Sequence, residues 1–291
     1  MAVGNIKTIR TKIRSIGNIK KITRAMQMVS ASKMRKAQDA ALATRPFTDK
    51  LRSILSRVSG GIAGQAKHAL TEVRDEKNVL VILISTNKGL CGGLNVNLHR
   101  GLLNFAAENP DATVSVATVG KKARWVIPGR DSDLVARFDT LHETPSFEEC
   151  RAITDYAMDR YLAGTFDSVY YAYPKFISTL TNEITVQKLL PVTSTPLDPA
   201  LHLHNTVEYK IEPDPTALIE RLLPYQVEMS LYQAILEARA TEHSARMVAM
   251  KNASDNARDL ISSLTLDYNS ARQSQVTSEL LDVTTARMAI E

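Results

Sequence analysis

The first part of the chain carries an apolar residue at every third or fourth position, with lysine, arginine, serine and threonine between them. This spacing is typical of a helix that packs one face against a partner. Pro46 is the first proline, and the residue before a proline is biased away from helical angles. We therefore predict a helix over residues 5–45, whose packed face consists of Ile6, Ile9, Ile13, Ile16, Ile19, Ile22, Met26 and Val29.

The last part of the chain predicts a second, longer helix. Asp214 and Pro215 suit a helix start, as N-cap and first helical residue. Pro224 predicts a kink, and neither proline nor glycine follows it. At 1.5 Å per residue, residues 225–291 would extend about 100 Å. The candidates for its packed face are Val227, Leu231, Ala234, Ala238, Ala245, Val248, Asn252, Leu260, Leu264, Tyr268, Ala271 and Leu281.

Between these helices, short apolar runs alternate with helical patterns. Residues 79–84 (VLVILI) form a continuous apolar run, as in a strand buried on both faces. Further strands are predicted at residues 113–119, 168–173 and 183–192. One helix follows the first strand, and another is expected from Ser146 to Leu162, where Ser146 and Glu149 have the spacing of a capping box. Alternating strands and helices predict a small α/β body.

The two ends of the chain carry opposite charge. Residues 1–57 hold 14 lysines and arginines against 2 acidic residues, and residues 208–291 hold 8 against 13. Long amphipathic helices need a partner in water, and opposite charge favours pairing these two. The predicted fold is an α/β body plus a long antiparallel coiled coil of the N- and C-terminal helices. The expected divisions are 1–57 and 212–291 for the coiled-coil helices, 76–195 for the Rossmann-like α/β domain, and 58–75 and 196–211 for connectors.

Composition excludes several classes of protein. Aromatic residues make up only 5% of the chain, and Cys91 and Cys150 are the two cysteines, so neither a disulfide framework nor a zinc set is expected. No apolar run is long enough to span a membrane, and the start lacks the apolar segment of a secretory leader. We expect no cofactor and no metal.

The glycine turn at residues 89–93 (GLCGG) follows a predicted strand and precedes a helix, where α/β domains bind phosphates. It lacks both the Lys-Ser/Thr end of a P-loop and the dinucleotide fingerprint, so a structural turn is preferred over a ligand loop. For Cys91, which lies within this turn, an inert buried thiol is the preferred interpretation, a redox-sensitive thiol comes second, and a catalytic nucleophile comes last. His202 and His204 form a possible metal pair without an evident third ligand.

Three classes of function fit these features: a subunit that transmits force or position, a nucleotide-binding enzyme built on the α/β body, and a nucleic-acid binder. The basic N-terminal helix could contact phosphates. However, its apolar stripe is aliphatic and has core spacing, and it lacks aromatic side chains for base stacking. The pattern favours packing against a helix while a cationic side faces an acidic protein.

Three segments of the chain resemble the gamma subunits of F-type ATP synthases: residues 20–38 (KKITRAMQMVSASKMRKAQ), 84–98 (ISTNKGLCGGLNVNL), and 245–261 (ARMVAMKNASDNARDLI) continuing into 266–280 (LDYNSARQSQVTSEL). EPDP at 212–215 also fits. The resemblance implies a non-catalytic rotor whose coiled coil sits in a ring of three alpha and three beta subunits. It implies a body beside the epsilon subunit and a foot on the membrane c ring. The implied location is peripheral, on the cytoplasmic side of a bacterial plasma membrane.

The resemblance also implies roles for particular residues. Met26 would lie in the neck near an acidic loop of beta, with a cationic collar of Lys33, Arg35 and Lys36 facing that loop. A second set would bind a catch loop of beta, and it consists of Glu242, Arg246, Gln273 and Thr277. Glu208 and Tyr209 would touch the c ring.

Overall fold

The computed structural model describes residues 2–61, 68–123, 134–192 and 215–288. The chain divides into two units, one of residues 1–31 with 246–291 and one of residues 32–245. Two helices contribute to both units: α1 (Ala2–Gly61) and α5 (Pro215–Met288). Each unit is described separately below.

Helix α1 continues past the point where the sequence predicts its end. We expected the helix to stop before Pro46, but Pro46 lies inside α1, which ends at Gly61. Proline in a helix interior removes one hydrogen bond and costs about 3 kcal/mol. The loss is tolerated here because Pro46 is exposed, while Ala41, Leu51 and Leu55 on the same helix are buried. Tertiary packing of that face outweighs the local preference. In α5, Pro224 also lies within the helix.

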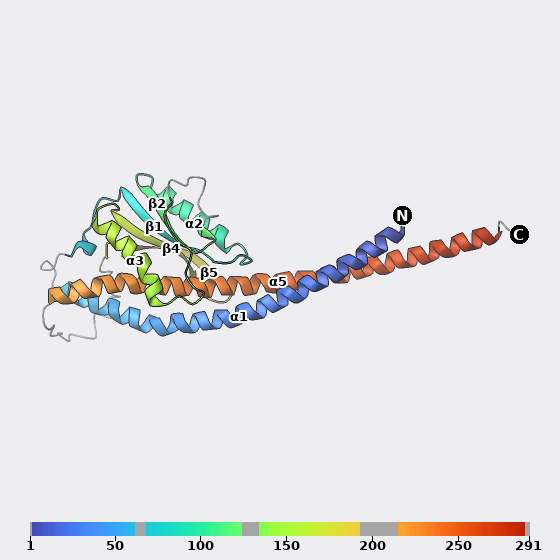
Figure 1. Ribbon diagram of the computed structural model, residues 1–291, viewed down its shortest axis with the longest axis horizontal. Helices are drawn as coiled ribbons and strands as arrows, with labels where there is room; N and C mark the ends of the chain where they lie inside the picture. The colour runs from blue at the N-terminus through green and yellow to red at the C-terminus, as the bar shows by residue number, and fades with distance from the viewer. Residues whose placement is uncertain (1, 62–67, 124–133, 193–214, 289–291) are drawn as a thin grey trace. The chain divides into compact units, whose positions relative to one another are not determined.

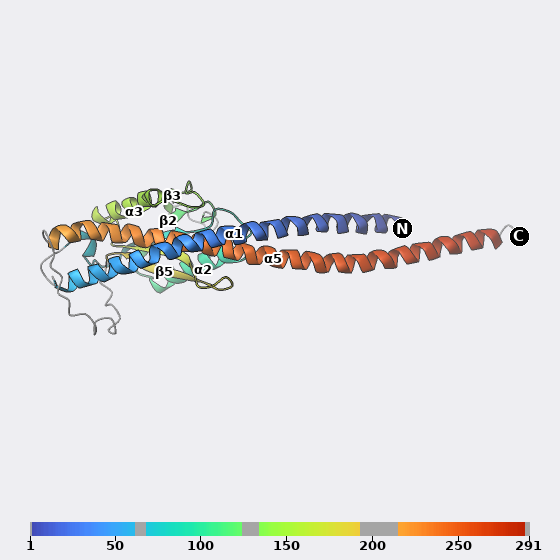
Figure 2. The same ribbon diagram turned by 90° about the horizontal axis from the view of Figure 1, so that it is seen from below.

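In the first unit, the segments of α1 and α5 that belong to it run side by side (Figure 2). Each segment shields one stripe at alternating steps of three and four, which is the heptad spacing of a left-handed coiled coil. On α1 the stripe is Ile6, Ile9, Ile13, Ile16, Lys20, Thr23, Gln27 and Ser30. On α5 it is Met250, Ser254, Ala257, Ile261, Leu264, Tyr268, Ala271 and Gln275.

The predicted packed faces are therefore only partly correct. On α1 the expected stripe holds to Ile16, but Ile19, Ile22 and Val29 are about half exposed. On α5, Asn252, Leu260 and Leu281 are exposed. The seven-residue repeat places Lys20, Thr23, Gln27 and Ser30 in the shielded stripe of α1, here called the seam. The neighbouring Ile19, Ile22 and Val29 therefore face outward.

The second unit contains a five-stranded sheet in the order β3-β2-β1-β4-β5. Strands β1 (Asn78–Ile84), β2 (Thr113–Val119), β3 (Leu134–Phe138) and β4 (Ser168–Phe176) are parallel, and β5 (Asn182–Leu190) pairs antiparallel with β4. The four predicted strands are confirmed. Strand β3 was missed because it is a short edge strand whose residues are at most half-buried, so it lacks a continuous apolar run.

Helices cover both faces of this sheet (Figure 1). On one face, α2 (Leu94–Glu108) buries Leu98, Leu102 and Phe105 against β1. The other face packs α3 (Phe147–Leu162) together with segments of α1 and α5. Ser146 caps α3, since its hydroxyl accepts from the Glu149 backbone N–H at 3.2 Å. A single 3-10 turn, η1 (Ala69–Thr71), precedes β1.

Within this unit, α1 and α5 pair in antiparallel fashion. Gln233 Nε2 donates to the Ala41 carbonyl at 3.2 Å, and Arg45 donates to Glu237 at 3.2 Å. Nearer the start of α5, the rings of Phe47 and Tyr225 meet edge to face. From the Ala41–Gln233 contact to the Phe47–Tyr225 contact, positions rise along α1 as they fall along α5, which defines the direction. The ion pair also joins a basic residue of the N-terminal helix to an acidic one of the C-terminal helix, as the charge pattern predicted.

Candidate functional site

Hydrogen bonds between side chains on either side of the glycine turn, and one to Cys91 within it, hold the turn between β1 and α2. Asn95 Nδ2 donates to the Thr86 hydroxyl at 2.9 Å and to Cys91 Sγ at 3.7 Å. Gly92 has a positive φ of 60°, a conformation that glycine adopts without strain. Leu90 also has a left-handed backbone conformation, with a φ of 63°. This conformation has a steric cost for leucine that glycine would avoid. This geometry favours the structural turn over the ligand loop.

Neither Cys91 nor Cys150 forms a disulfide bond, and both are buried. Burial raises the pKa of the Cys150 thiol to about 12, with the Glu149 carboxylate adding to the shift. A thiol with this pKa stays protonated at neutral pH, and the thiolate is the reactive form. Cys91 is equally enclosed, and its sulfur accepts the Asn95 amide. The buried-thiol interpretation of Cys91 therefore fits better than a nucleophile.

Two lysines from separate elements share one carboxylate. Glu143 accepts from Lys33 Nζ on α1 and from Nζ of Lys88, which immediately precedes the glycine turn, the latter at 2.8 Å. The hydrogen bond from Lys33, followed by that from Lys88, lowers the pKa of Glu143 to about 2. Through these two contacts, the Glu143 carboxylate links the segment that contains Glu143, and the segment that contains Lys88, to α1.

The basic surface of the folded chain therefore differs in membership from the predicted cationic collar of Lys33, Arg35 and Lys36. Lys33 is half-buried on Glu143, whereas Arg35 and Lys36 are exposed. Lys88, which immediately precedes the glycine turn, is also exposed and joins this basic surface. The sequence did not point to Lys88 and Glu143 because the contacts are long-range. Glu143 lies 110 positions after Lys33 and 55 positions after Lys88. The only signal was the lysine within the matched motif TNKGLCGG.

The predicted catch residues on α5 fall into two environments. Glu242 and Arg246 are buried, and Glu242 accepts from Arg239 Nη1 at 2.9 Å. Gln273 and Thr277 are exposed and lie one turn apart, with the Thr277 hydroxyl donating to the Gln273 carbonyl at 2.9 Å. The structure therefore brings Gln273 and Thr277 together on an open surface, and it turns Glu242 inward.

The end of α5 presents apolar side chains to solvent. Residues 276–288 are all exposed, and among them are Val276, Leu280, Leu281, Val283 and Met288. On α1, Met26 is half-buried, beside the exposed Ile22 and Val29. Exposed apolar side chains in such numbers mark an interaction surface.

The remaining predicted positions lie outside the described residues: Glu208, Tyr209, His202 and His204. Over the parts of the chain that the structure describes, no group of three or more His, Cys, Asp or Glu is placed to hold a metal ion. None of the described helices has a stretch long and apolar enough to cross a membrane.

These features define a class of protein in which a three-layer α/β body carries long antiparallel helices with exposed apolar and basic surfaces. The family model described as ATP synthase matches residues 5–290. ATP synthase gamma chains of Dehalococcoides mccartyi strain BAV1 and Roseiflexus sp. strain RS-1 are 41% identical over 282 residues and 40% identical over 287. The alignments cover 97% of both chains in the first case and 98% in the second. The chain belongs to this ATP synthase family, as a relative of its non-catalytic gamma chains.

Solved structures agree with this assignment. The central stalk and c ring of Tetrahymena thermophila mitochondrial ATP synthase includes a chain that is 25% identical, with a TM-score of 0.60, covering 80% of this chain and 99% of that one. A chain in the rotor of Euglena gracilis mitochondrial ATP synthase shares the fold, with a TM-score of 0.66 at 20% identity, covering 94% of this chain and 99% of that one.

Proposed function

We propose that this chain is the central-stalk rotor subunit of an ATP synthase. It couples proton-driven rotation of the membrane c ring to conformational changes at the catalytic sites of the alpha/beta head. Its partners are three alpha and three beta subunits, the epsilon subunit and the c ring. The complex would lie on the cytoplasmic side of the plasma membrane, with this chain as a peripheral subunit.

The observation that carries this proposal is the set of exposed apolar side chains at the end of α5. Residues 276–288 form a regular helix, and their side chains, including several large apolar ones, are exposed in this chain. A single helix in water gains most of its stability from packing. The apolar side chains of this segment therefore need an enclosing partner, and the ring of alpha and beta subunits provides such a sleeve.

A second part of the proposal concerns the basic surface. Arg35, Lys36 and Lys88 are exposed, and Lys33 lies beside them on Glu143. We propose that this surface meets the acidic loop of beta, with Met26 in the adjoining neck. Complementary charge at such a moving contact adds orientation and specificity more than affinity. Lys33 contributes by holding Lys88 in place through the shared carboxylate.

The catch contact is proposed to involve Gln273 and Thr277 directly, because both side chains are open to a partner. Glu242 and Arg246 are buried, so they would act by ordering α5. Glu208 and Tyr209 remain proposed c-ring contacts.

Rotation acts on the head through differential contacts. A ligand or subunit shifts a conformational equilibrium only when it interacts differently with the two states. An asymmetric shaft meets three chemically identical beta subunits with different faces, so each nucleotide site is held in a different state. The chain thereby changes affinity at sites that it does not form.

The experiment that tests this function is purification of the tagged chain from its native cell in mild detergent, followed by native mass spectrometry. A particle with three alpha subunits, three beta subunits and one copy of this chain, hydrolysing ATP, is expected. A free monomer or a homodimer without ATPase partners would contradict the proposal.

A further inference from the structure

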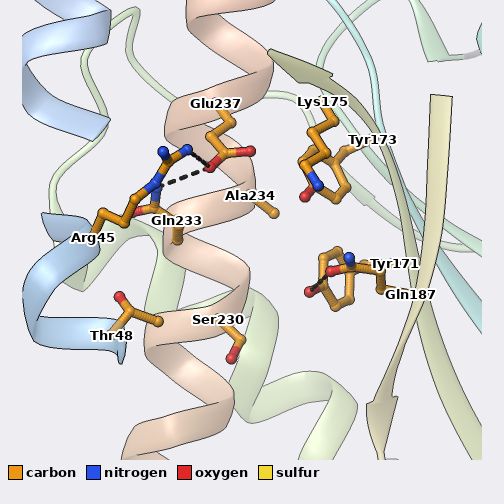
Figure 3. Close-up of a pocket in the computed structure, with 10 residues that line it drawn as sticks. All are labelled: Arg45, Thr48, Tyr171, Tyr173, Lys175, Gln187, Ser230, Gln233, Ala234 and Glu237. Atoms are coloured by element: carbon orange, nitrogen blue, oxygen red, sulfur yellow. Dashed lines mark hydrogen bonds and ion pairs between the residues drawn. The ribbon is translucent and has the colours of Figure 1, made fainter. Parts of the chain in front are cut away.

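The second unit contains a polar cavity of about 330 Å³ between β4, α5 and α1 (Figure 3). This volume lies at the small end of the range for ligand pockets, roughly 300–1,000 Å³. Tyr171 and Tyr173 form one wall from β4, with their rings stacked 5.5 Å apart. Glu237 faces them from α5, and Arg45 borders the cavity from α1.

The floor of the cavity holds an incompletely satisfied carboxylate. Glu237 Oε1 accepts from Arg45 at 3.2 Å and from Gln233 Nε2 at 3.0 Å. The other oxygen, Oε2, is enclosed and accepts no hydrogen bond. The Glu237 side chain is only 8% exposed. A buried carboxylate oxygen without a donor is costly, so this atom is an open position for a donor that enters the cavity.

The adjacent tyrosine does not fill that position. The Tyr173 hydroxyl lies close enough to Glu237 for the carboxylate to raise its pKa, after the larger effect of burial. Nevertheless, no hydrogen bond of normal geometry joins the two groups. The raised pKa keeps the Tyr173 hydroxyl neutral, and the Glu237 carboxyl group faces the cavity.

Two cations lie where the cavity meets solvent. The Arg45 side chain is 51% exposed, and Lys175 is exposed at the end of β4. Arg45 already bonds Glu237, and no ion pair of Lys175 is found within the described part of the chain. The cavity therefore combines a buried acceptor, two aromatic faces and a cationic rim.

We propose that this cavity binds a small zwitterion of the α-amino acid class, a role separate from the rotor function. The ammonium group would donate to Glu237 Oε2, and the carboxylate would face Lys175 and Arg45. The apolar body would lie against the rings of Tyr171 and Tyr173. Charge-assisted hydrogen bonds at both ends give the selectivity, because a ligand that lacks either group leaves one partner unpaired.

Binding would join three elements that meet at the cavity. Arg45 belongs to α1, Glu237 to α5, and Tyr171, Tyr173 and Lys175 to β4. A ligand that binds only the folded arrangement raises its stability by mass action. The occupied cavity would thus stiffen the attachment of the sheet to the paired helices within this unit.

The test is calorimetry on the full chain with three probes of similar shape: L-phenylalanine, phenethylamine as the amine alone, and 3-phenylpropionate as the acid alone. L-phenylalanine is expected to bind with a dissociation constant of ~1 mM or tighter, and each single-function probe at least about ten-fold more weakly. Glu237→Gln should weaken L-phenylalanine about ten-fold or more, because the amide bears no charge for the ammonium. Glu220→Gln, an exposed change on the same helix, should leave binding unchanged.

A second variant keeps the test decisive if Glu237→Gln fails to fold. Lys175→Met at the exposed rim should remove most of the advantage of L-phenylalanine over phenethylamine. The proposal is overturned if no probe binds at ~10 mM, so that the cavity holds water only. It is equally overturned if phenethylamine and L-phenylalanine bind to the unaltered chain with the same affinity. It is also overturned if the Glu237→Gln and Lys175→Met variants both fold and bind L-phenylalanine as tightly as the unaltered chain.

Discussion

Arg239 Nη1 donates to Glu242 Oε2 at 2.9 Å along one turn of α5, and the two side chains are only 3% and 5% exposed. Removing two charges from water is costly, and a buried pair offsets this only with good geometry and full hydrogen bonding. Arg239 Nε and Nη2 have no hydrogen-bond partner. The pair is therefore better regarded as a constraint on this part of α5 than as a source of stability.

The first prediction concerns this pair. Glu242→Leu strands the Arg239 charge, so we expect a loss of roughly 3–5 kcal/mol in the free energy of unfolding. Arg239→Leu with Glu242→Leu should recover most of that loss, because the Arg239 charge is removed together with its counter-charge. Urea unfolding of the full chain measures both. A double variant as unstable as Glu242→Leu would show that the pair is needed for stability.

The second prediction concerns Gly101 on α2. A Cβ at this position would lie 2.6 Å from Ile184 Cγ2 on β5, and Ile184 is stiff because it is β-branched. Gly101→Ala should therefore destabilise the chain by about 1–3 kcal/mol, despite the better helix propensity of alanine. Adding Ile184→Ala should relieve the clash, which thermal unfolding of a double-mutant cycle would measure.

Gly17 on α1 offers the matched control, since a Cβ there meets nothing within 4 Å. Gly17→Ala is expected to be neutral or to stabilise the helix by up to about 1 kcal/mol. If Gly101→Ala behaves like Gly17→Ala, the close contact between α2 and β5 is not limiting.

The third prediction is a pH dependence at Glu143. Its pKa in the folded chain is about 2, against an ordinary value of 4.5, because Lys33 and Lys88 donate to it. The folded-state pKa is depressed, so the stabilisation is present above pH 4.5 and is lost as the pH falls towards about 2. Glu143 is more than one-third exposed, so solvent screening keeps the effect at pH 7 below about 1 kcal/mol.

Glu143→Gln should therefore destabilise the chain slightly at pH 7 and progressively less at pH values below 4.5. Urea unfolding at several pH values measures the difference between the two chains. Glu183→Gln removes an exposed carboxylate of β5 and serves as the charge-matched control. A constant difference between Glu143→Gln and the unaltered chain across this range would argue against the shared ion pair.

The fourth prediction tests the basic surface in the assembled complex. Replacing Arg35, Lys36 and Lys88 with alanine should lower ATP-driven proton pumping more than ATP hydrolysis, because the contact with the acidic loop is weakened. Inverted membrane vesicles report both activities. Alanine at Lys50, Lys77 and Arg100 removes the same charge from other exposed positions. Equal coupling in the two triple variants would refute a specific role for this surface.

The fifth prediction concerns the exposed end of α5. Leu280→Asp with Leu281→Asp should change the free energy of unfolding of the isolated chain by less than about 0.5 kcal/mol, because neither side chain is packed. In the complex, the same change should reduce the yield of particles that contain alpha and beta subunits, as native mass spectrometry would show. Leu280→Met with Leu281→Met is the apolar control. Undiminished assembly of the aspartate variant would place these leucines outside any sleeve.

Much of the fold follows from local patterns. The apolar run at 79–84 is fully buried in β1, and residues 113–119 form β2 at the predicted bounds. Ser146 caps α3 where its spacing to Glu149 predicted a helix start. These signals are short-range consequences of side-chain periodicity and of hydrogen bonding at a helix end, so they are legible without knowledge of distant neighbours.

Other features depend on partners far away in the chain. Pro46 stays helical because the opposite face of α1 is buried, and Lys20 and Thr23 replace Ile19 and Ile22 in the seam because the paired helix imposes its own repeat. The candidate site shows the same division. Its motifs identified the family and the basic residues of α1, but the sharing of Glu143 by Lys33 and Lys88 exists only in the folded chain.

The sequence by itself determined four of the five strands of the sheet, the positions of the long helices, how charge is divided between the two ends, and which family the chain belongs to. Tertiary structure alone decided which face of each helix is covered, and that Glu242 turns inward while Gln273 and Thr277 remain open. The reason is physical: periodicity defines an amphipathic element, whereas burial and pairing depend on groups that only long-range packing brings within a few ångströms.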